Sequence, residues 1–371
     1  MFDLLPSPLD SILAFVIVLG VLVFIHELGH YLAARWCGVH VEVFSIGFGR
    51  PIASWVDRQG TVWKLAWIPL GGYVKMHGQE QPADASDEVR AKWIAGRTFH
   101  EKSVGARSFV VAAGPLANFL LAAVLFAGLY AVIGRPLMPP VIGAVVDGSV
   151  AARAGLRAGD RIVAIDGVAV SRFEELQRSI AAAPGINLTL RLRRGAEELD
   201  VPVVPEPRDA GSGRQTGMLG IRNGAMEFEA IGTGSAVLAG VAQTWDVTVK
   251  TLVGLGQMIS GKTGTEDLGG PLRIAQLSGQ VAQLGFASLV SFIAVLSVNL
   301  ALINLFPIPI LDGGHLVFYL AEAIRGRPLP PRAQEYGMRA GLALILALFV
   351  FATWNDLGHL GLFRWVAALV G

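Results

Sequence analysis

His26, Glu27 and His30 stand in the stretch VLVFIHELGHYLAARWCGV, which runs from Val21 to Val39 and is otherwise strongly apolar. Two histidines four residues apart leave the same face of a helix, so both can bind one metal ion. Catalytic zinc usually has three protein ligands and one open position for water. The sequence therefore predicts a zinc site with His26 and His30 as ligands and Glu27 as the base. The alternative is a pair of packing histidines at a helix end.

Asp312, in the stretch NLFPIPILDGGH, is the best candidate for a third ligand. Pro307 and Pro309 end the preceding helix, and the two glycines after Asp312 let the backbone approach closely. The alternative is a turn closed by the aspartate side chain. Glu322 is a second candidate for the ligand. A metal site that needs an anionic ligand among apolar segments favours Asp312.

Four apolar runs are long enough to cross about 30 Å of hydrocarbon as helices. They cover about Ser11 to Ala34, Ser108 to Gly134, Leu284 to Phe306 and Gly337 to Phe351, the last being short. The 371 residues are 53% hydrophobic and 16% charged, which indicates spans combined with water-soluble parts. The net charge of +1 and the lack of a basic stripe argue against a nucleic-acid partner. A single cysteine excludes an internal disulfide.

Lysine and arginine gather between the first and second runs and between the third and fourth, and none precedes the first run. Basic loops stay in the cytoplasm, so the long segment between the second and third runs is predicted to lie outside. The first run lacks the basic start and the cleavage site of a signal peptide and is predicted to be a retained span.

Two parts of the chain lack the sequence pattern of a transmembrane helix. The region from Val41 to Met76 is rich in β-branched and aromatic residues and predicts a small hairpin or sheet. Residues of about Pro140 to Asn223 alternate short strand patterns with one amphipathic helix and predict a compact α/β module. The segment after it is amphipathic and predicts a helix on the membrane surface.

The motifs HELGH, GPLAN and NLFPIPILDGGH, in this order, together with AARAGLRAGDRIVAIDG, resemble the site-2 family of intramembrane zinc metalloproteases and its RseP-like bacterial branch. The last motif, residues Ala151 to Gly167, resembles the core of a PDZ domain. The likeness extends over nearly the whole chain. One departure concerns the PDZ modules, of which this chain has room for one where the best-known members of the branch carry two.

The resemblance implies a polytopic α-helical membrane protein with about four transmembrane helices, a membrane-associated β-hairpin or sheet and an inserted extracytoplasmic PDZ (α/β) domain. The expected division is 1–36, first transmembrane helix; 37–104, cytoplasmic-side loop with β-strands; 105–134, second transmembrane helix; 138–225, circularly permuted periplasmic PDZ domain; 226–283, amphipathic surface segment; 284–316, third transmembrane helix and the loop with Asp312; 317–336, cytoplasmic loop; 337–371, fourth transmembrane helix and tail.

The resemblance also implies roles for individual residues. His26, His30 and Asp312 would be the zinc ligands and Glu27 the catalytic base. Asn304 would stabilise the oxyanion, or would instead satisfy backbone groups freed by Pro307. Gly114, Pro115 and Asn118 match the motif of the second span, for which a kinked, closely packed helix is a sufficient role. The carboxylate-binding loop of the PDZ domain would be Gly217, Met218, Leu219, Gly220 and Ile221, although its groove would equally serve as a gate that binds no peptide.

The expected activity is zinc-dependent cleavage of single-span membrane proteins, such as anti-sigma-factor-like regulators and signal-peptide remnants, in the bacterial inner membrane. The expected partners are these substrates, the lipid bilayer and a C-terminal peptide at the PDZ groove. Water would reach the site from the cytoplasmic side, along a path lined by Gly29 and other small residues. Two alternatives remain: a PDZ scaffold with a structural metal, and another class of membrane zinc protease that takes its third ligand from a glutamate on a later helix.

Overall fold

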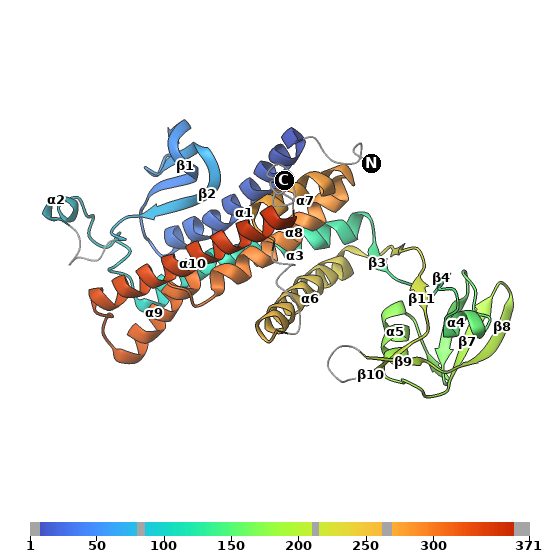
Figure 1. Ribbon diagram of the computed structural model, residues 1–371. Helices are drawn as coiled ribbons and strands as arrows, with labels where there is room; N and C mark the ends of the chain where they lie inside the picture. Colours follow the sequence, from blue (N-terminus) through green and yellow to red (C-terminus); the bar gives the residue numbers. More distant parts are fainter. Residues whose placement is uncertain (1–7, 80–85, 210–214, 262–268, 360–371) are drawn as a thin grey trace, which may run out of the picture. The chain divides into compact units, whose positions relative to one another are not determined.

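The computed structural model describes residues 8–79, 86–209, 215–261 and 269–359 (Figure 1). The chain divides into two compact units, of which the first comprises Met1–Leu129 with Val237–Gly371 and the second comprises Tyr130–Ala236. Each unit has its own hydrophobic core. The predicted tail falls mostly beyond residue 359, outside the described residues.

Four helices of the first unit are long and apolar enough to cross a membrane: α1 (Pro8–Trp36), α3 (Val104–Val132), α8 (Phe286–Leu305) and α10 (Pro331–His359). Candidate spans were sought only among the described residues. The first three agree with the predicted runs to within a few residues. The fourth was expected to be short, but its helix takes in the polar turn that begins at Pro331 and extends beyond Trp354. Hydropathy alone finds the apolar middle of a helix and misses polar ends.

The first, second and third spans pack through small residues and aliphatic side chains. Val18 and Leu22 of α1 are buried against Ile293 of α8, with leucines of α3 beside them. Gly29 of α1 lies against α3, where a Cβ atom would be 2.7 Å from the Cβ of Ala117. The missing side chain of Gly29 thus brings two helices together, while its expected place on a water path stays a prediction.

The predicted hairpin is confirmed as two long, bent strands, β1 (Val41–Val56) and β2 (Val62–Met76). The first half of β1 pairs on one side with residues 72–76 and on the other with residues 62–65, and residues 62–65 also pair with 53–56. Two strands thus form a curled sheet with the segment order 72–76, 41–46, 62–65, 53–56. Residues 72–76 form one of its two edges, next to α1.

Three further helices complete the first unit: α6 (Thr233–Ile259), α7 (Pro271–Gln283) and α9 (Asp312–Arg325), with the single turn α2 (Asp87–Arg90) before α3. Helix α7 packs on α1, and Gly279 would bring a Cβ atom within 2.9 Å of Ser11. The carboxylate of Asp356 on α10 accepts hydrogen bonds from the amides of Gly270, Leu272 and Arg273. The last span thereby caps the first turn of α7.

The second unit is the predicted α/β module. Strands β5 (Arg161–Ile165), β6 (Val168–Ala169), β7 (Leu188–Arg194) and β8 (Glu197–Val203) form a sheet of order β6-β5-β7-β8. Helix α5 (Phe173–Ala181) buries Phe173, Leu176 and Ile180 in the unit's core. The remaining elements are β3 (Arg135–Leu137), β4 (Ile142–Val145), α4 (Val150–Arg153), β9 (Glu206–Asp209), β10 (Gln215–Met218), β11 (Ile221–Asn223) and β12 (Glu227–Glu229).

Candidate metal centre

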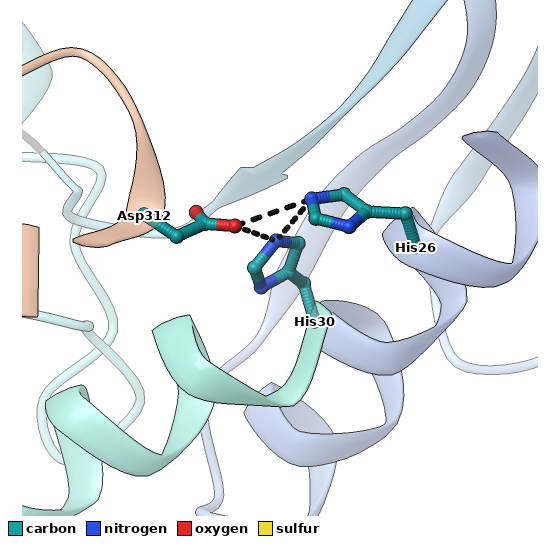
Figure 2. Close-up of side chains that lie close together, drawn as sticks. All are labelled: His26, His30 and Asp312. Carbon is teal, nitrogen blue, oxygen red and sulfur yellow. Dashed lines mark hydrogen bonds and ion pairs between the residues drawn. The ribbon is translucent and has the colours of Figure 1, made fainter. Parts of the chain in front are cut away.

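Three ligand atoms converge between α1 and α9, as Figure 2 shows. Oδ2 of Asp312 lies 3.2 Å from Nε2 of His26 and 3.4 Å from Nε2 of His30, and the two Nε2 atoms are 3.3 Å apart. A tetrahedral zinc ion with bonds of about 2.0–2.1 Å holds its ligand atoms about 3.3–3.4 Å apart. The three distances therefore match one face of a zinc coordination tetrahedron.

The environment of these atoms also fits a metal. Both histidines are less than 10% exposed. Oδ2 of Asp312 is buried and accepts no hydrogen bond, although it faces two imidazole nitrogens. A buried carboxylate oxygen without a hydrogen bond is costly, and a cation bound at this position would offset the cost.

The local sequence explains how the three side chains meet. His26 and His30 are one helical turn apart on α1, with their ring centroids 4.8 Å apart. Asp312 is the first residue of α9, directly after the loop that contains Pro307 and Pro309. In that loop Ile310 has a φ of +97°, a strained conformation for a β-branched residue. A Cβ atom at Gly313 would collide with the carbonyl groups of Leu305 and Phe306, so the loop folds tightly on itself.

Helix α3 supports the histidines from the other side. Nδ1 of His30 lies 2.9 Å from the carbonyl oxygen of Val110, and Nδ1 of His26 lies 3.3 Å from Nδ2 of Asn118. A Cβ atom at Gly114 would lie 2.6 Å from Cε1 of His30, so only glycine leaves room for that ring. The motif around Gly114 is thus part of the site's wall.

Glu27 lies on α1 next to His26 and outside the three-ligand group. The backbone amide of Val74 on β2 donates a hydrogen bond to its carboxylate. A Cβ atom at Gly72 would be 3.1 Å from Cγ of Glu27. The edge segment 72–76 therefore runs directly past the residue predicted to be the base.

The other candidates lie outside the ligand group. Glu322 accepts a hydrogen bond of 2.7 Å from Nη2 of Arg107 on α3, so its carboxylate is already paired. Nδ2 of Asn304 donates to the carbonyl oxygen of Leu300 one turn earlier in α8. His315, the histidine three residues after Asp312, packs against Phe318 and is not a member of the group either. Among the described residues, the group has three members, which leaves one coordination position for water or substrate.

The predicted carboxylate loop of the second unit joins β10 to β11. Leu219 is buried, and its carbonyl oxygen accepts from the amide of Ala151. The carbonyl oxygen of Gly220 accepts from Val146, and Gly220 has a φ of +79°. Met218 is 45% exposed beside them. Strand β11, late in the unit, pairs with β4, early in the unit.

The candidate site has two imidazoles, a carboxylate and one open position, beside a glutamate and among helices long enough to span a membrane. A membrane metallohydrolase requires these features. Comparison with known proteins gives the family. The profile of peptidase family M50 matches residues 14–348. The chain belongs to peptidase family M50, the site-2 proteases, and is a zinc-dependent metalloprotease.

Several relatives extend along nearly the full length of the chain. A protein of Agrobacterium fabrum named as a zinc metalloprotease is 44% identical over 366 residues, which are 94% of this chain and 96% of the relative. A protein of Rhizobium meliloti with the same kind of name is 43% identical over 362 residues, 94% of this chain and 97% of the relative. Metalloprotease MmpA of Caulobacter vibrioides is 37% identical over 392 residues, with 97% of this chain and 98% of the relative covered.

Part of the chain is also similar to solved structures. One of them is the PDZ domain of an SdrC-like protein from Listeria monocytogenes, with 24% identity and a TM-score of 0.21. The match covers 23% of this chain and 87% of that domain.

Proposed function

We propose that this metalloprotease cleaves single-span membrane proteins within or next to their membrane-spanning segments, with His26, His30 and Asp312 as zinc ligands. The observation that supports this most strongly is the depth of the site. His26 and His30 lie six to ten residues before the end of α1, or about 9–15 Å along a helix axis. That position is inside the hydrocarbon for a helix that crosses the whole bilayer.

In this proposal the chain's own groups divide the chemistry. Zinc, when bound, supplies a Lewis acid that polarises the scissile carbonyl and acidifies water. Glu27 accepts the proton of the attacking water and returns it to the leaving amine. The amide of Val74 holds the Glu27 carboxylate in place. Asn304, at the last turn of α8, would stabilise the oxyanion once its amide turns from Leu300 toward the substrate.

The sheet offers a way to hold a substrate in an extended form. A transmembrane helix shields its carbonyl groups, so its backbone must unwind before hydrolysis. An unwound segment would add as a strand to the edge 72–76, which already passes Glu27. Proline at position 76, which leaves the amide of Val74 on Glu27, should then abolish cleavage while zinc stays bound. Unchanged cleavage in such a variant would rule out strand addition at this edge.

The substrates expected from the sequence are anti-sigma-factor-like regulators and signal-peptide remnants in the bacterial inner membrane. The second unit would act as a periplasmic, circularly permuted PDZ domain. Its loop Gly217–Ile221 would bind a C-terminal peptide or exclude bulky substrates. The pairing of β11 with β4 supports the permuted order, because the strand after this loop returns to the start of the unit.

The test uses purified wild-type, Glu27→Gln and Asp312→Ala proteins, each measured for bound zinc and for cleavage of a single-span reporter with a helix-breaking residue. Zinc retained but cleavage lost in Glu27→Gln, with zinc lost in Asp312→Ala, is the expected result. Equal cleavage by wild type and Glu27→Gln would favour a scaffold with a structural metal. An Asp312→Ala protein that keeps its zinc would favour another class of membrane zinc protease.

A further inference from the structure

Asn118 of α3 is fully buried beside the metal centre, and its side chain has one satisfied end and one unsatisfied end. Nδ2 lies 3.3 Å from Nδ1 of His26, while Oδ1 is buried without any hydrogen-bond partner. The backbone of Asn118 is held within α3, and its carbonyl oxygen also accepts a hydrogen bond of 2.8 Å from Oγ of the buried Ser297 on α8. A buried amide with an orphaned oxygen calls for an explanation.

The proton on His26 provides that explanation. Nε2 of His26 faces Asp312 and His30, so it must be unprotonated to bind zinc. The ring proton then resides on Nδ1 and needs an acceptor. Asn118 presents its NH2 group there, which is a donor. The two donors would face each other in the zinc-loaded protein.

Rotation of the amide by half a turn removes this conflict. The oxygen and nitrogen of an asparagine amide exchange places at nearly equal shape. After rotation, Oδ1 faces Nδ1 of His26 and accepts its proton. The NH2 group moves to the position where Oδ1 had no partner, so one unpaired atom replaces another. The hydrogen bond to His26 therefore decides the orientation.

His30 provides an internal comparison. Its Nδ1 lies 2.9 Å from the carbonyl oxygen of Val110, which can only accept a hydrogen bond. The backbone therefore fixes the proton of His30 on Nδ1 and leaves Nε2 free for zinc whether or not the metal is present. His26 has no such carbonyl at its Nδ1 among the described contacts, and its partner is a side chain that can donate or accept.

We propose that Asn118 is a positioning residue for zinc binding, whose amide oxygen accepts the Nδ1 proton of His26 in the loaded enzyme and whose amide nitrogen donates to Nδ1 in the metal-free enzyme. This inference rests on the proposed ligand role of His26. It predicts that His26 changes its tautomer when zinc binds and that His30 does not. The side chain of Asn118 turns over in the same step.

The experiment measures zinc affinity of the purified full-length protein by competition with a chelator. Asn118→Leu removes the acceptor at similar size, and loss of such a partner should weaken zinc binding about 10- to 100-fold. Asn118→Asp keeps an acceptor and should bind zinc within about threefold of wild type. Ser297→Ala is the control, because it removes the backbone contact of Asn118 and leaves its amide in place. Its affinity should stay close to that of wild type.

Two outcomes would overturn the proposal: wild-type zinc affinity in Asn118→Leu, or an Asn118→Asp protein as weak as Asn118→Leu. In the second case Asn118 would matter through packing alone. A His26→Ala variant separates this failure from that of the proposed function. If His26→Ala keeps zinc, the proposed ligand set fails; if it loses zinc while Asn118→Leu does not, only the positioning role fails.

A second measurement needs no variant and remains valid if Asn118→Leu does not fold. Nitrogen-15 NMR of histidine-labelled wild-type protein reports which ring nitrogen carries the proton. With zinc removed, the resonances of His26 should show the proton on Nε2, and with zinc restored, on Nδ1. The resonances of His30 should show it on Nδ1 in both states. A His26 proton that stays on Nδ1 without zinc would refute the coupled rotation.

Discussion

Replacement of Gly114 by alanine should disable the metal centre without disturbing the helix that carries it. The added Cβ atom would lie 2.6 Å from Cε1 and 2.9 Å from Cδ2 of His30. Carbon atoms in favourable contact are about 3.5–4.0 Å apart, so the ring must move by about 1 Å. Metal–ligand distances tolerate about 0.2 Å. The ring cannot retreat toward α3, because α3 supplies the obstructing methyl group.

We expect Gly114→Ala to weaken zinc binding at least about tenfold, and to lower cleavage about 100-fold, since a misplacement of about 1 Å at a reacting centre has an effect of this order. Chelator competition measures the zinc affinity, and the reporter assay measures the rate of cleavage. Gly128→Ala is the matched control on the same helix, because a Cβ atom there meets nothing within 4 Å. It should keep full zinc affinity. Wild-type affinity in Gly114→Ala would show that His30 does not depend on this close approach.

Three further predictions concern other parts of the chain. Ile310→Gly should raise the unfolding temperature in detergent, since strain at its φ of +97° costs about 1–3 kcal/mol; a large loss of stability would contradict this. Glu322→Gln should keep zinc but destabilise by up to about 3 kcal/mol, because the buried guanidinium of Arg107 loses its carboxylate partner. Additive losses in a double-mutant cycle with Arg107→Met would argue against coupling. Burial raises the pKa of the Asp160 carboxyl, but the ion pair with Arg194 outweighs burial and holds this pKa below its ordinary 3.8. The ion pair therefore stabilises the second unit above pH 3.8, and this stability is lost as the pH falls below that value. Hydrogen exchange at stepped pH should show the loss, and the Asp160→Asn protein should be less stable at pH 7 and less sensitive to acid.

The local part of the site followed from the sequence because a helix fixes the spacing of its own side chains. His26 and His30 meet as their separation requires, and Asp312 joins them. The supports from α3 were not foreseen. Val110 and Asn118 lie about eighty to ninety residues from their histidines, and no period in the sequence relates them. The motif that contains Asn118 was visible, but its side-chain partner depends on how two spans pack.

In the fold, too, the elements that depend on local sequence were predictable, and the contacts between distant segments were not. Apolar runs predicted the spans because the bilayer demands length and hydropathy. Strand patterns predicted β1 and β2, whereas their double pairing depends on how the strands bend, which alternation does not encode. The close contact of Gly29 with α3 was not predicted, because a small residue is equally compatible with a passage and with a close helix contact.

The cap that Asp356 provides to α7 has a consequence for biosynthesis. Helix α1, which carries both histidines, leaves the ribosome before α7, which packs on it. Among the described residues, the amides of Gly270, Leu272 and Arg273 at the start of α7 donate to the carboxylate of Asp356. The cap of the helix that packs on α1 therefore forms only after residue 356 has been translated, more than 300 residues after the histidines. A nascent chain that ends before that residue would hold α1 and α7 without this cap.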